Sequence, residues 1–242
     1  MCPICIQSYH KAIHPGMHCG RIVCRWCAAE SYKKSQQAQE KGWFDNEIHD
    51  VSFKVRRADV TVGEDEEPGK AKFDKVPQLR SAFEKDGTIT AANASKINDG
   101  AAALLIASSQ AVQEYGLKPL VRIVSSAVAG VEPRIMGIGP VMASRKALKR
   151  AGLTLDDMDV LELNEAFSAQ VLACTRELGL KDNDPRINPN GGAISLGHPL
   201  GMSGSRILLT AARQLQATNK RYALVTMCIG VGQGYATILE KA

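Results

Sequence analysis

The sequence lacks long apolar runs, has few aromatic residues, and shows no targeting segment at its start. Its longest uninterrupted apolar stretch, residues 101–107, is far too short to cross a bilayer, which takes roughly 20 residues in a helix. Neither a basic-then-apolar signal peptide nor an Arg-rich amphipathic transit peptide opens the chain. We therefore expect a cytoplasmic protein with no membrane partner.

Strong charge of one sign is also missing. The formal net charge is +5 over 242 residues, and the basic residues are scattered among acidic ones, so no nucleic-acid partner is expected. Hydrophobic residues make up 45% and charged residues 23%, which is ordinary for a soluble globular protein. A slightly basic chain suits an anionic ligand but does not identify one.

Cysteine is scarce after residue 27, where only Cys174 and Cys228 remain, and we expect Cys174 to be an inert buried residue within a helix. The first 27 residues are different. They contain two CxxC pairs at a spacing close to that of four-cysteine zinc sites, formed by Cys2, Cys5, Cys24 and Cys27. This composition ends abruptly at Ala28, as an altered reading frame or a mis-joined exon would also produce. The cysteines of the leader can therefore be present without any selection for metal binding. Zinc stays an alternative, and we assign no metal ligand.

The pattern of apolar residues predicts an α/β protein. Strands are expected at residues 47–55, 120–128, 160–163, 222–227 and 235–239, with a buried strand at 102–107. Helices are expected at 28–38, 73–84, 108–115, 141–151, 165–178 and 202–215, and a further helix start near 98–99. The alternation of the two element types in the second half requires a layered α/β domain.

A glycine-rich loop, residues 188–201, carries the most informative histidine. His198 lies just before the helix expected at 202–215, where glycines permit close backbone approach and the helix start offers free N–H groups. A histidine in such a place can transfer a proton near neutral pH. Two further segments, Asn164-Glu165-Ala166-Phe167 and residues 228–234, follow expected strands, where ligands of α/β folds usually bind.

Together these segments, with residues 93–95 and 97–102, make the chain resemble the thiolase family, enzymes that cleave or form β-ketoacyl-CoA thioesters. The resemblance implies a layered fold of two β-α-β-α-β-α-β-β halves with an inserted loop domain. Residues 28–96 would be part of the CoA-binding loop domain, and 97–117 the end of the N-terminal half. Residues 118–242 would form the C-terminal domain, after an atypical Cys/His-rich leader at 1–27. Most of the N-terminal half is not in the sequence.

The resemblance also implies catalytic roles. His198 would activate the nucleophilic cysteine, Cys228 would transfer the α-proton, Asn164 would orient a water in one oxyanion hole, and the Gly230 N–H would complete the other. We expect nearby N–H groups to stabilise the Cys228 thiolate. Without the resemblance, a cysteine at the end of a strand is more often a buried packing residue than a catalytic one. An asparagine there is more often the N-cap of the next helix.

Coenzyme A would be a substrate, with no permanently bound cofactor. By resemblance Ser95 touches the pantetheine, Ala166 and Phe167 line the acyl end, and the pocket helix carries Val76, Leu79 and Phe83. Three apolar residues on one helix face can equally be core. Family members commonly form dimers or tetramers, so a homo-oligomer is expected. The segments 184–192 and 227–234 are most similar to bacterial degradative thiolases, including those that act on β-ketoadipyl-CoA.

The acylated cysteine of the family, followed closely by Ser or Gly, has no counterpart among the early cysteines. We therefore expect a thiolase-class acyltransferase that is inactive or impaired as this chain. The alternative is a non-catalytic half-thiolase that packs with another chain, or a zinc-stabilised interaction protein.

Overall fold

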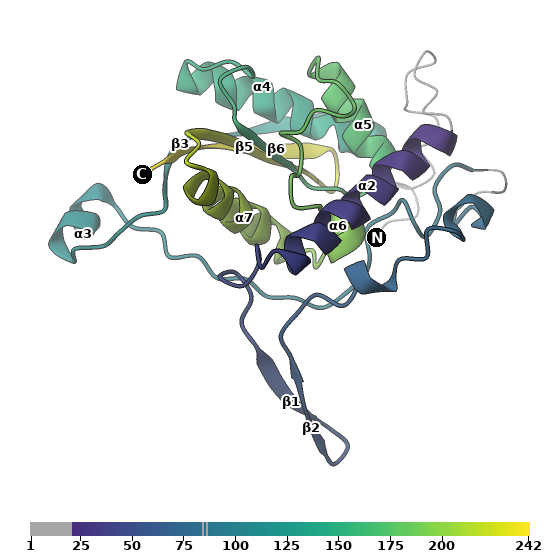
Figure 1. Cartoon of the computed structure of the whole chain (residues 1–242). Coiled ribbons are helices and arrows are strands. Elements are labelled where there is room, and N and C mark those ends of the chain that lie inside the picture. Colours follow the sequence, from purple (N-terminus) through teal and green to yellow (C-terminus); the bar gives the residue numbers. More distant parts are fainter. Residues whose placement is uncertain (1–20, 84, 86) are drawn as a thin grey trace.

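The structure is a computed structural model that describes residues 21–83, 85 and 87–242. Its main body is a four-stranded sheet with helices on both faces (Figure 1). The strand order is β3 (Val121–Gly130), β6 (Gln233–Lys241), β5 (Tyr222–Ile229) and β4 (Val160–Leu163). β6 pairs antiparallel with β3 and β5, whereas β4 and β5 are parallel. This confirms the expected α/β layered fold.

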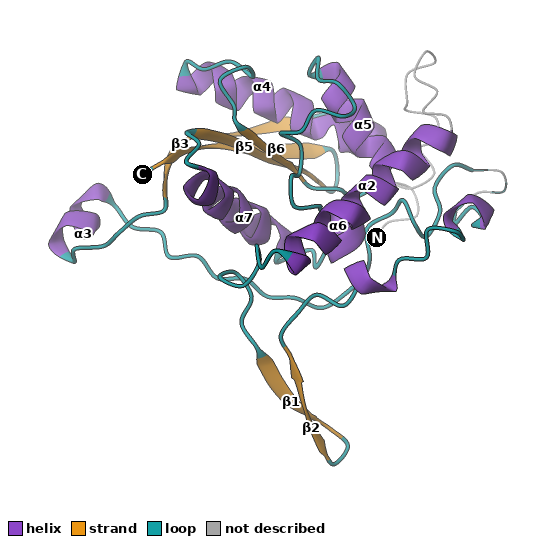
Figure 2. Cartoon of the chain, in the orientation of Figure 1, coloured by secondary structure: helices purple, strands orange, loops and turns teal. Residues whose placement is uncertain are grey.

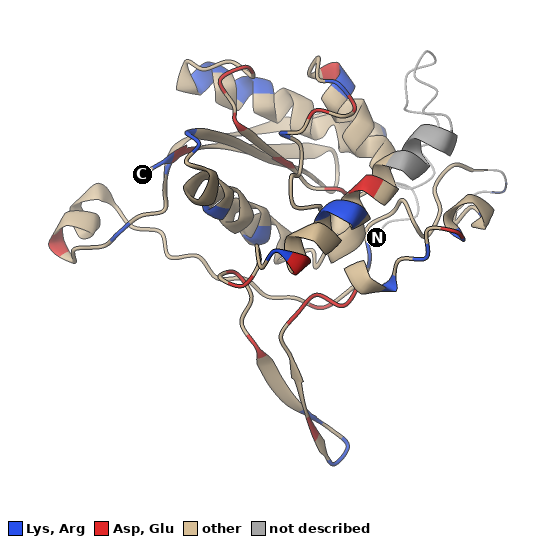
Figure 3. Cartoon of the chain, viewed as in Figure 1, with Lys and Arg blue, Asp and Glu red and all other residues tan. Residues whose placement is uncertain are grey.

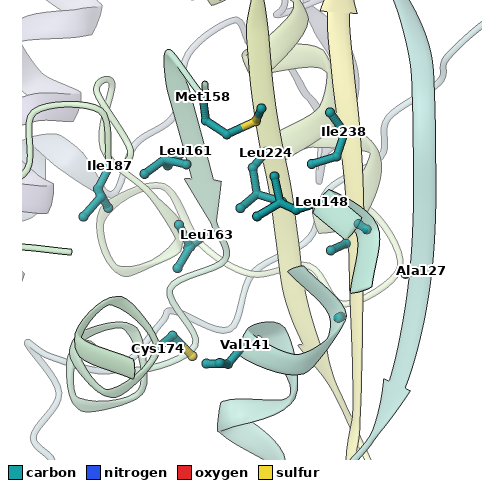
Figure 4. Close-up of a cluster of buried hydrophobic side chains, with 13 residues drawn as sticks. Ala127, Val141, Leu148, Met158, Leu161, Leu163, Cys174, Ile187, Leu224 and Ile238 are labelled. Carbon is teal, nitrogen blue, oxygen red and sulfur yellow. The ribbon is translucent and has the colours of Figure 1, made fainter. Parts of the chain in front are cut away.

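Alternate residues of the strands supply two separate cores. On one face, Leu161 and Leu224 pack beneath the helices α4 (Gly139–Ala151) and α5 (Ser168–Glu177), as Figure 4 shows for this cluster. On the other face, Val160 and Ala223 pack against α7 (Ser203–Thr218). Because successive side chains of a strand point to opposite faces, an unbroken apolar strand buries both sides and forces helices onto each.

The elements expected in this body are confirmed with small shifts in their ends. Pro140 lies in the first turn of α4, where its missing N–H costs nothing, and the left-handed Gly152 ends that helix. Helix α5 begins at Ser168, three residues later than expected. The short helix α6 (Ala193–Leu196) in the glycine-rich loop was not expected.

The part of the chain before the sheet is more extended. Helix α2 (Arg21–Glu40) confirms the helix expected from residue 28, and Gly42 follows its end with φ of +67°. The strand expected at 47–55 is β1 (Val51–Val55), which forms a hairpin with β2 (Ala58–Val62). This hairpin extends away from the main body (Figure 2), and most of the chain between it and α3 (Ser109–Glu114) is loop.

Three expected elements of this region are wrong. The helix expected at 73–84 is only a single 3₁₀ turn, Val76–Gln78, because Pro77 cannot sit in the interior of an α-helix. No helix begins near Asn98, and the buried strand expected at 102–107 is an exposed, unpaired segment, with Leu105 86% exposed. That segment has the composition of a buried strand, but no described strand pairs with it. Among the described residues, no helix is long and apolar enough to cross a membrane.

Candidate active site

The carboxyl ends of two parallel strands place the first pair of candidate residues. Asn164 follows β4, and its backbone N–H donates to the carbonyl of Thr226 on the neighbouring β5 at 3.0 Å. Cys228 lies two residues further along β5. The side chains therefore belong to one end of the sheet, as expected for the ligand-binding edge of an α/β fold.

The glycine-rich loop brings His198 to the same end. Gly197 has φ of +107°, and a Cβ at this position would overlap the amide of Asn98, so only glycine fits. The backbone N–H of His198 donates to the Lys96 carbonyl at 3.1 Å and to Asn98 Oδ1 at 3.0 Å. Residues 96–98 thus fix the position of the histidine.

The tautomer of His198 follows from its neighbours. Ser203 Oγ lies 2.5 Å from His198 Nδ1 and 3.0 Å from the Pro199 carbonyl oxygen. The carbonyl can only accept, so the single hydroxyl proton of Ser203 goes to it, and Nδ1–H then donates to Ser203 Oγ. Nε2 is left without a proton, 3.3 Å from Asn164 Nδ2, which can donate to it. The arrangement leaves Nε2 as the basic nitrogen.

The protonation of His198 is also set by its surroundings. Burial lowers the pKa of His198, and the positive charge of Arg206 lowers it further. The ring is therefore neutral at neutral pH. Asn164 is 1% exposed, and its Oδ1 has no hydrogen-bond partner among the described residues. A neutral base and an unused amide acceptor thus lie next to each other.

Cys228 is buried in an apolar cluster with Ile89, Ala166 and Phe167. Burial raises the pKa of Cys228 to about 11, so the free side chain is a thiol at neutral pH. A backbone hydrogen bond lowers the pKa of Cys228, in the direction expected for a thiolate near N–H groups, but desolvation outweighs it. The fully buried Cys174 also has a raised pKa for the same reason, in keeping with an inert thiol.

Several residues expected to bind the CoA moiety meet beside this cluster. The Ser95 N–H donates to the Ala166 carbonyl at 3.0 Å, and Ala94 pairs with Phe167 across a β-bridge. The rings of Phe83 and Phe167 meet edge to face with centroids 6.3 Å apart. The described chain thus brings Phe83 to Phe167 and Ser95 to Ala166, and Ala166 and Phe167 pack in one cluster with Cys228.

The remaining candidates lie further out. Val76 begins the 3₁₀ turn and Leu79 follows its end in extended conformation, so they share no helix face with Phe83, and the pocket helix expected from their spacing does not form. Gly230 is exposed in the turn between β5 and β6, two residues after Cys228. Its backbone N–H is therefore near the strand end without being buried.

Two residues that support the site were not expected from the sequence. Ser203 holds the imidazole of His198 through Nδ1, and Glu165 links three separate segments of the chain by hydrogen bonds. The buried Glu165 accepts hydrogen bonds from Ser31 Oγ at 2.6 Å, Asn188 Nδ2 at 2.9 Å and the Ile194 N–H at 3.2 Å. The position of Ser203 at the start of α7, five residues after His198, was a signal for its role. Glu165 gave none beyond its place in the motif.

No metal site is found in the described part of the chain, which contains no cluster of three or more histidine, cysteine or acidic side chains. Cys2 and Cys5, and the side chain of Cys24, fall outside the described residues, so the zinc alternative stays open. Cys27 lines a cavity of about 240 Å³ between α2, α5 and residues 182–188, which also touches Glu165. Neither His198 nor Cys228 lines that cavity.

Comparison with known proteins gives two family matches. The model for the thiolase C-terminal domain matches residues 117–241, and that for the thiolase N-terminal domain matches residues 20–110. The β-ketoadipyl-CoA thiolase of Acinetobacter baylyi is 52% identical over 216 residues, covering 88% of this chain and 54% of that protein. An acetyl-CoA acetyltransferase of Syntrophomonas wolfei is 48% identical over 204 residues, covering 84% and 52%.

Solved structures agree. The Bacillus anthracis acetyl-CoA acetyltransferase superimposes with a TM-score of 0.92 at 38% identity, covering 97% of this chain and 59% of that one. Human mitochondrial 3-ketoacyl-CoA thiolase gives a TM-score of 0.89 at 40% identity, covering 98% and 60%. The chain thus spans about half the length of the curated relatives it matches.

Proposed function

The chain belongs to the thiolase family, and from this premise we propose that it acts on coenzyme A thioesters. The reaction is the transfer of an acyl group between CoA thioesters, from β-ketoacyl-CoA and CoA to acyl-CoA and acetyl-CoA, or the reverse condensation. The identity to β-ketoadipyl-CoA thiolases favours a substrate of that kind. The observation that carries the proposal is the neutral His198, with Nε2 free of a proton, held beside Asn164.

Each site residue receives a role that its chemistry permits. His198 Nε2 takes a proton from a thiol and, once protonated, donates to the thioester oxygen. The Cys228 thiol gives its proton to the α-carbon, and the thiolate takes that proton back in the opposite direction; the raised pKa makes the thiolate the stronger base for this step. Asn164 orients a water that donates to one thioester oxygen, and the N–H of Gly230 donates to the other, so that both stabilise the negative charge that develops there.

Binding of the CoA moiety is assigned to the residues around Phe167. Phe83, Ala166 and Ser95 would hold the pantetheine arm, which is apolar with a few amide groups, and Val76 and Leu79 would lie further along it. On this assignment residues 28–96 are part of the loop domain. Residues 97–117 belong to the end of the N-terminal half, and 118–242 are the C-terminal domain. CoA is a substrate, with no permanent cofactor, and the location is cytoplasmic.

We further propose that the chain alone does not complete the cycle, because no cysteine in the sequence has the context of the acylated thiol. The exposed apolar segment 97–107, with Ile97 92% exposed, favours the second candidate function, a half-thiolase that packs with another chain. For the same reason we expect a homo-oligomer or other association. Metal analysis of the purified chain tests the zinc version of this alternative.

Calorimetric titration with CoA tests the first proposal. We expect binding that Phe83→Ala weakens about tenfold, while Tyr115→Ala, which removes an aromatic ring that is 70% exposed, leaves the affinity unchanged. A chain with no CoA affinity would contradict the assignment. Ordinary turnover of acetoacetyl-CoA, or acyl label recovered on one of the early cysteines, would contradict the missing nucleophile instead.

A further inference from the structure

The hairpin of β1 and β2 has one wholly apolar face. Its register pairs Val51 with Val62, Phe53 with Val60 and Val55 with Ala58. These six residues share one side of the two-stranded sheet, because alternate residues of each strand point the same way. The intervening pairs, Ser52 with Thr61 and Lys54 with Asp59, make the other side polar. We call the six-residue side the apolar hairpin face.

This face is open in the isolated chain. Val51 is 58% exposed, Phe53 46% and Val55 47%, and the hairpin extends away from the main body (Figure 1). An isolated two-stranded hairpin is at best marginally stable in water. It usually needs further strands or an element packed against its apolar side. The alternation of apolar and polar residues is typical of a sheet with one covered face. The residue pattern of the hairpin therefore predicts that another element covers its apolar face.

The charges at the two ends of the hairpin indicate which partner. Arg56 and Arg57 form the tip, and both are exposed. Asp50 and Glu64 flank the base and are also exposed, so the two ends carry opposite charge, as Figure 3 shows. A second hairpin running in the opposite direction would place its basic tip beside this acidic base, and the reverse contact would form at the other end. That pairing is self-complementary about a twofold axis.

We propose that the apolar hairpin face is a self-association surface, covered by the same face of a second copy whose hairpin runs antiparallel to the first. Two sheets packed in this way lie about 10 Å apart, over five-residue strands of about 17 Å. The face is small compared with the roughly 800 Å² that each partner buries in a stable interface, so the dimer is weak and concentration-dependent. The proposal rests on the association of chains proposed above, and not on the acyl-transfer reaction.

Sedimentation equilibrium across a range of concentrations tests it first with a pair of variants on the two sides of one strand. Phe53→Glu places a charge on the apolar face, and we expect it to weaken dimerisation at least tenfold. Ser52→Glu places the same charge on the polar side and should leave dimerisation nearly unchanged. Both sites are exposed, so circular dichroism should show the same fold in each variant.

A charge exchange identifies the occupant. The Arg56→Glu, Arg57→Glu variant puts acids at both ends of the hairpin, and the Asp50→Lys, Glu64→Lys variant puts bases at both ends. Each variant alone should be monomeric, and an equimolar mixture should form the heterodimer, because the antiparallel pairing then matches opposite charges at both ends. High salt should weaken the mixed dimer.

Three results would overturn the proposal. They are a chain that stays monomeric at high concentration, a mixture that does not associate, and self-association that persists in Phe53→Glu but is lost in Leu105→Asp. The last would assign the interface to residues 97–107. The CoA titration is a separate measurement, so failure of the hairpin interface and failure of the proposed function are distinguishable.

Discussion

Residues 222–229 and 101–107 are both runs of apolar residues, yet they end in opposite environments. Leu224 in β5 is completely buried, whereas Leu105 is 86% exposed. β6 pairs with β5 along its whole length, and β4 pairs with it over residues 223–226, so the backbone at Leu224 has a neighbouring strand on both sides. No strand of the described chain pairs with residues 101–107. An apolar run therefore predicts burial only where the chain also supplies the strands and helices that cover it.

The largest expected effect separates these two leucines directly. Leu224→Ala should lower the free energy of unfolding by about 2–5 kcal/mol, because it leaves a cavity in the core beneath α4. Leu105→Ala should change it by less than about 0.5 kcal/mol. Urea unfolding followed by circular dichroism measures both. Equal losses would show that residues 101–107 are buried in solution.

The buried carboxyl group of Glu162 offers a second contrast. Burial raises the pKa of Glu162 to about 8 from 4.5, with Arg206 lowering it only in part. Between these two values the unfolded chain releases a proton that the folded chain keeps, so stability falls as pH rises, by about 1.4 kcal/mol per unit. The stability of Glu162→Gln, followed from pH 4.5 to 8, should lack this contribution.

The matched control for that titration is Glu64→Gln, which removes an exposed carboxyl group near the hairpin and should leave the profile of the wild type unchanged. Glu47 also has a pKa raised mainly by burial, and so does Asp65. They add slopes of the same sign to every variant, so the difference between wild type and Glu162→Gln reports Glu162 together with its coulombic coupling to Glu47. A parallel pair of profiles would mean that Glu162 is ionised in the folded protein.

A glycine of the β5–β6 turn and a glycine of β6 give a smaller contrast. A Cβ at Gly234 would overlap the main chain of Gly139 and Pro140, whereas a Cβ at Gly230 meets nothing within 4 Å. Gly234→Ala should therefore cost about 1–3 kcal/mol in thermal or urea unfolding. Gly230→Ala should be nearly neutral for stability, and it keeps the N–H assigned to the oxyanion hole. If both substitutions were neutral, β6 and α4 would not approach each other as closely in solution as they do at Gly234 and Gly139.

The smallest effect is confined to the extended region. The side chain of Ser108 accepts a hydrogen bond from the Ala111 N–H at 3.1 Å and caps α3, a helix that buries none of its residues. Ser108→Ala should destabilise this helix by about 1 kcal/mol without moving the unfolding midpoint of the protein. Hydrogen exchange at residues 111–114 should accelerate about fivefold. A shift of the global midpoint would show that α3 is coupled to the main body.

The sequence predicted the sheet and its helices well because each of those elements is complete within the chain. β4 and the middle parts of β5 and β6 are buried on both faces, and α4 begins near a proline and ends at a glycine. The helix expected at 73–84 failed because the apolar spacing was given more weight than Pro77. β2 was missed because the turn at Arg56 and Arg57 contains no glycine or asparagine, the usual residues of a two-residue hairpin loop.

The candidate site was predictable in its members but not in their states. The rule that ligands bind at the carboxyl ends of strands places Asn164 and Cys228 together, and the structure brings His198 to Asn164. The protonation of Cys228 depends on Ile89 and Phe167, which are distant in sequence, so the raised pKa could not be read from neighbouring residues. The roles of these groups in catalysis stay predictions.

The hydrogen bond from the backbone of His198 to Asn98 joins positions that are 100 residues apart in the chain. Bringing such distant positions together costs conformational entropy before the contact returns any stabilisation. The pairing of β3 with β6 carries the same cost, since Val121 and its partner Lys241 are 120 residues apart. We therefore expect the fixing of His198 and the closing of the outer edge of the sheet to report the same late event in folding.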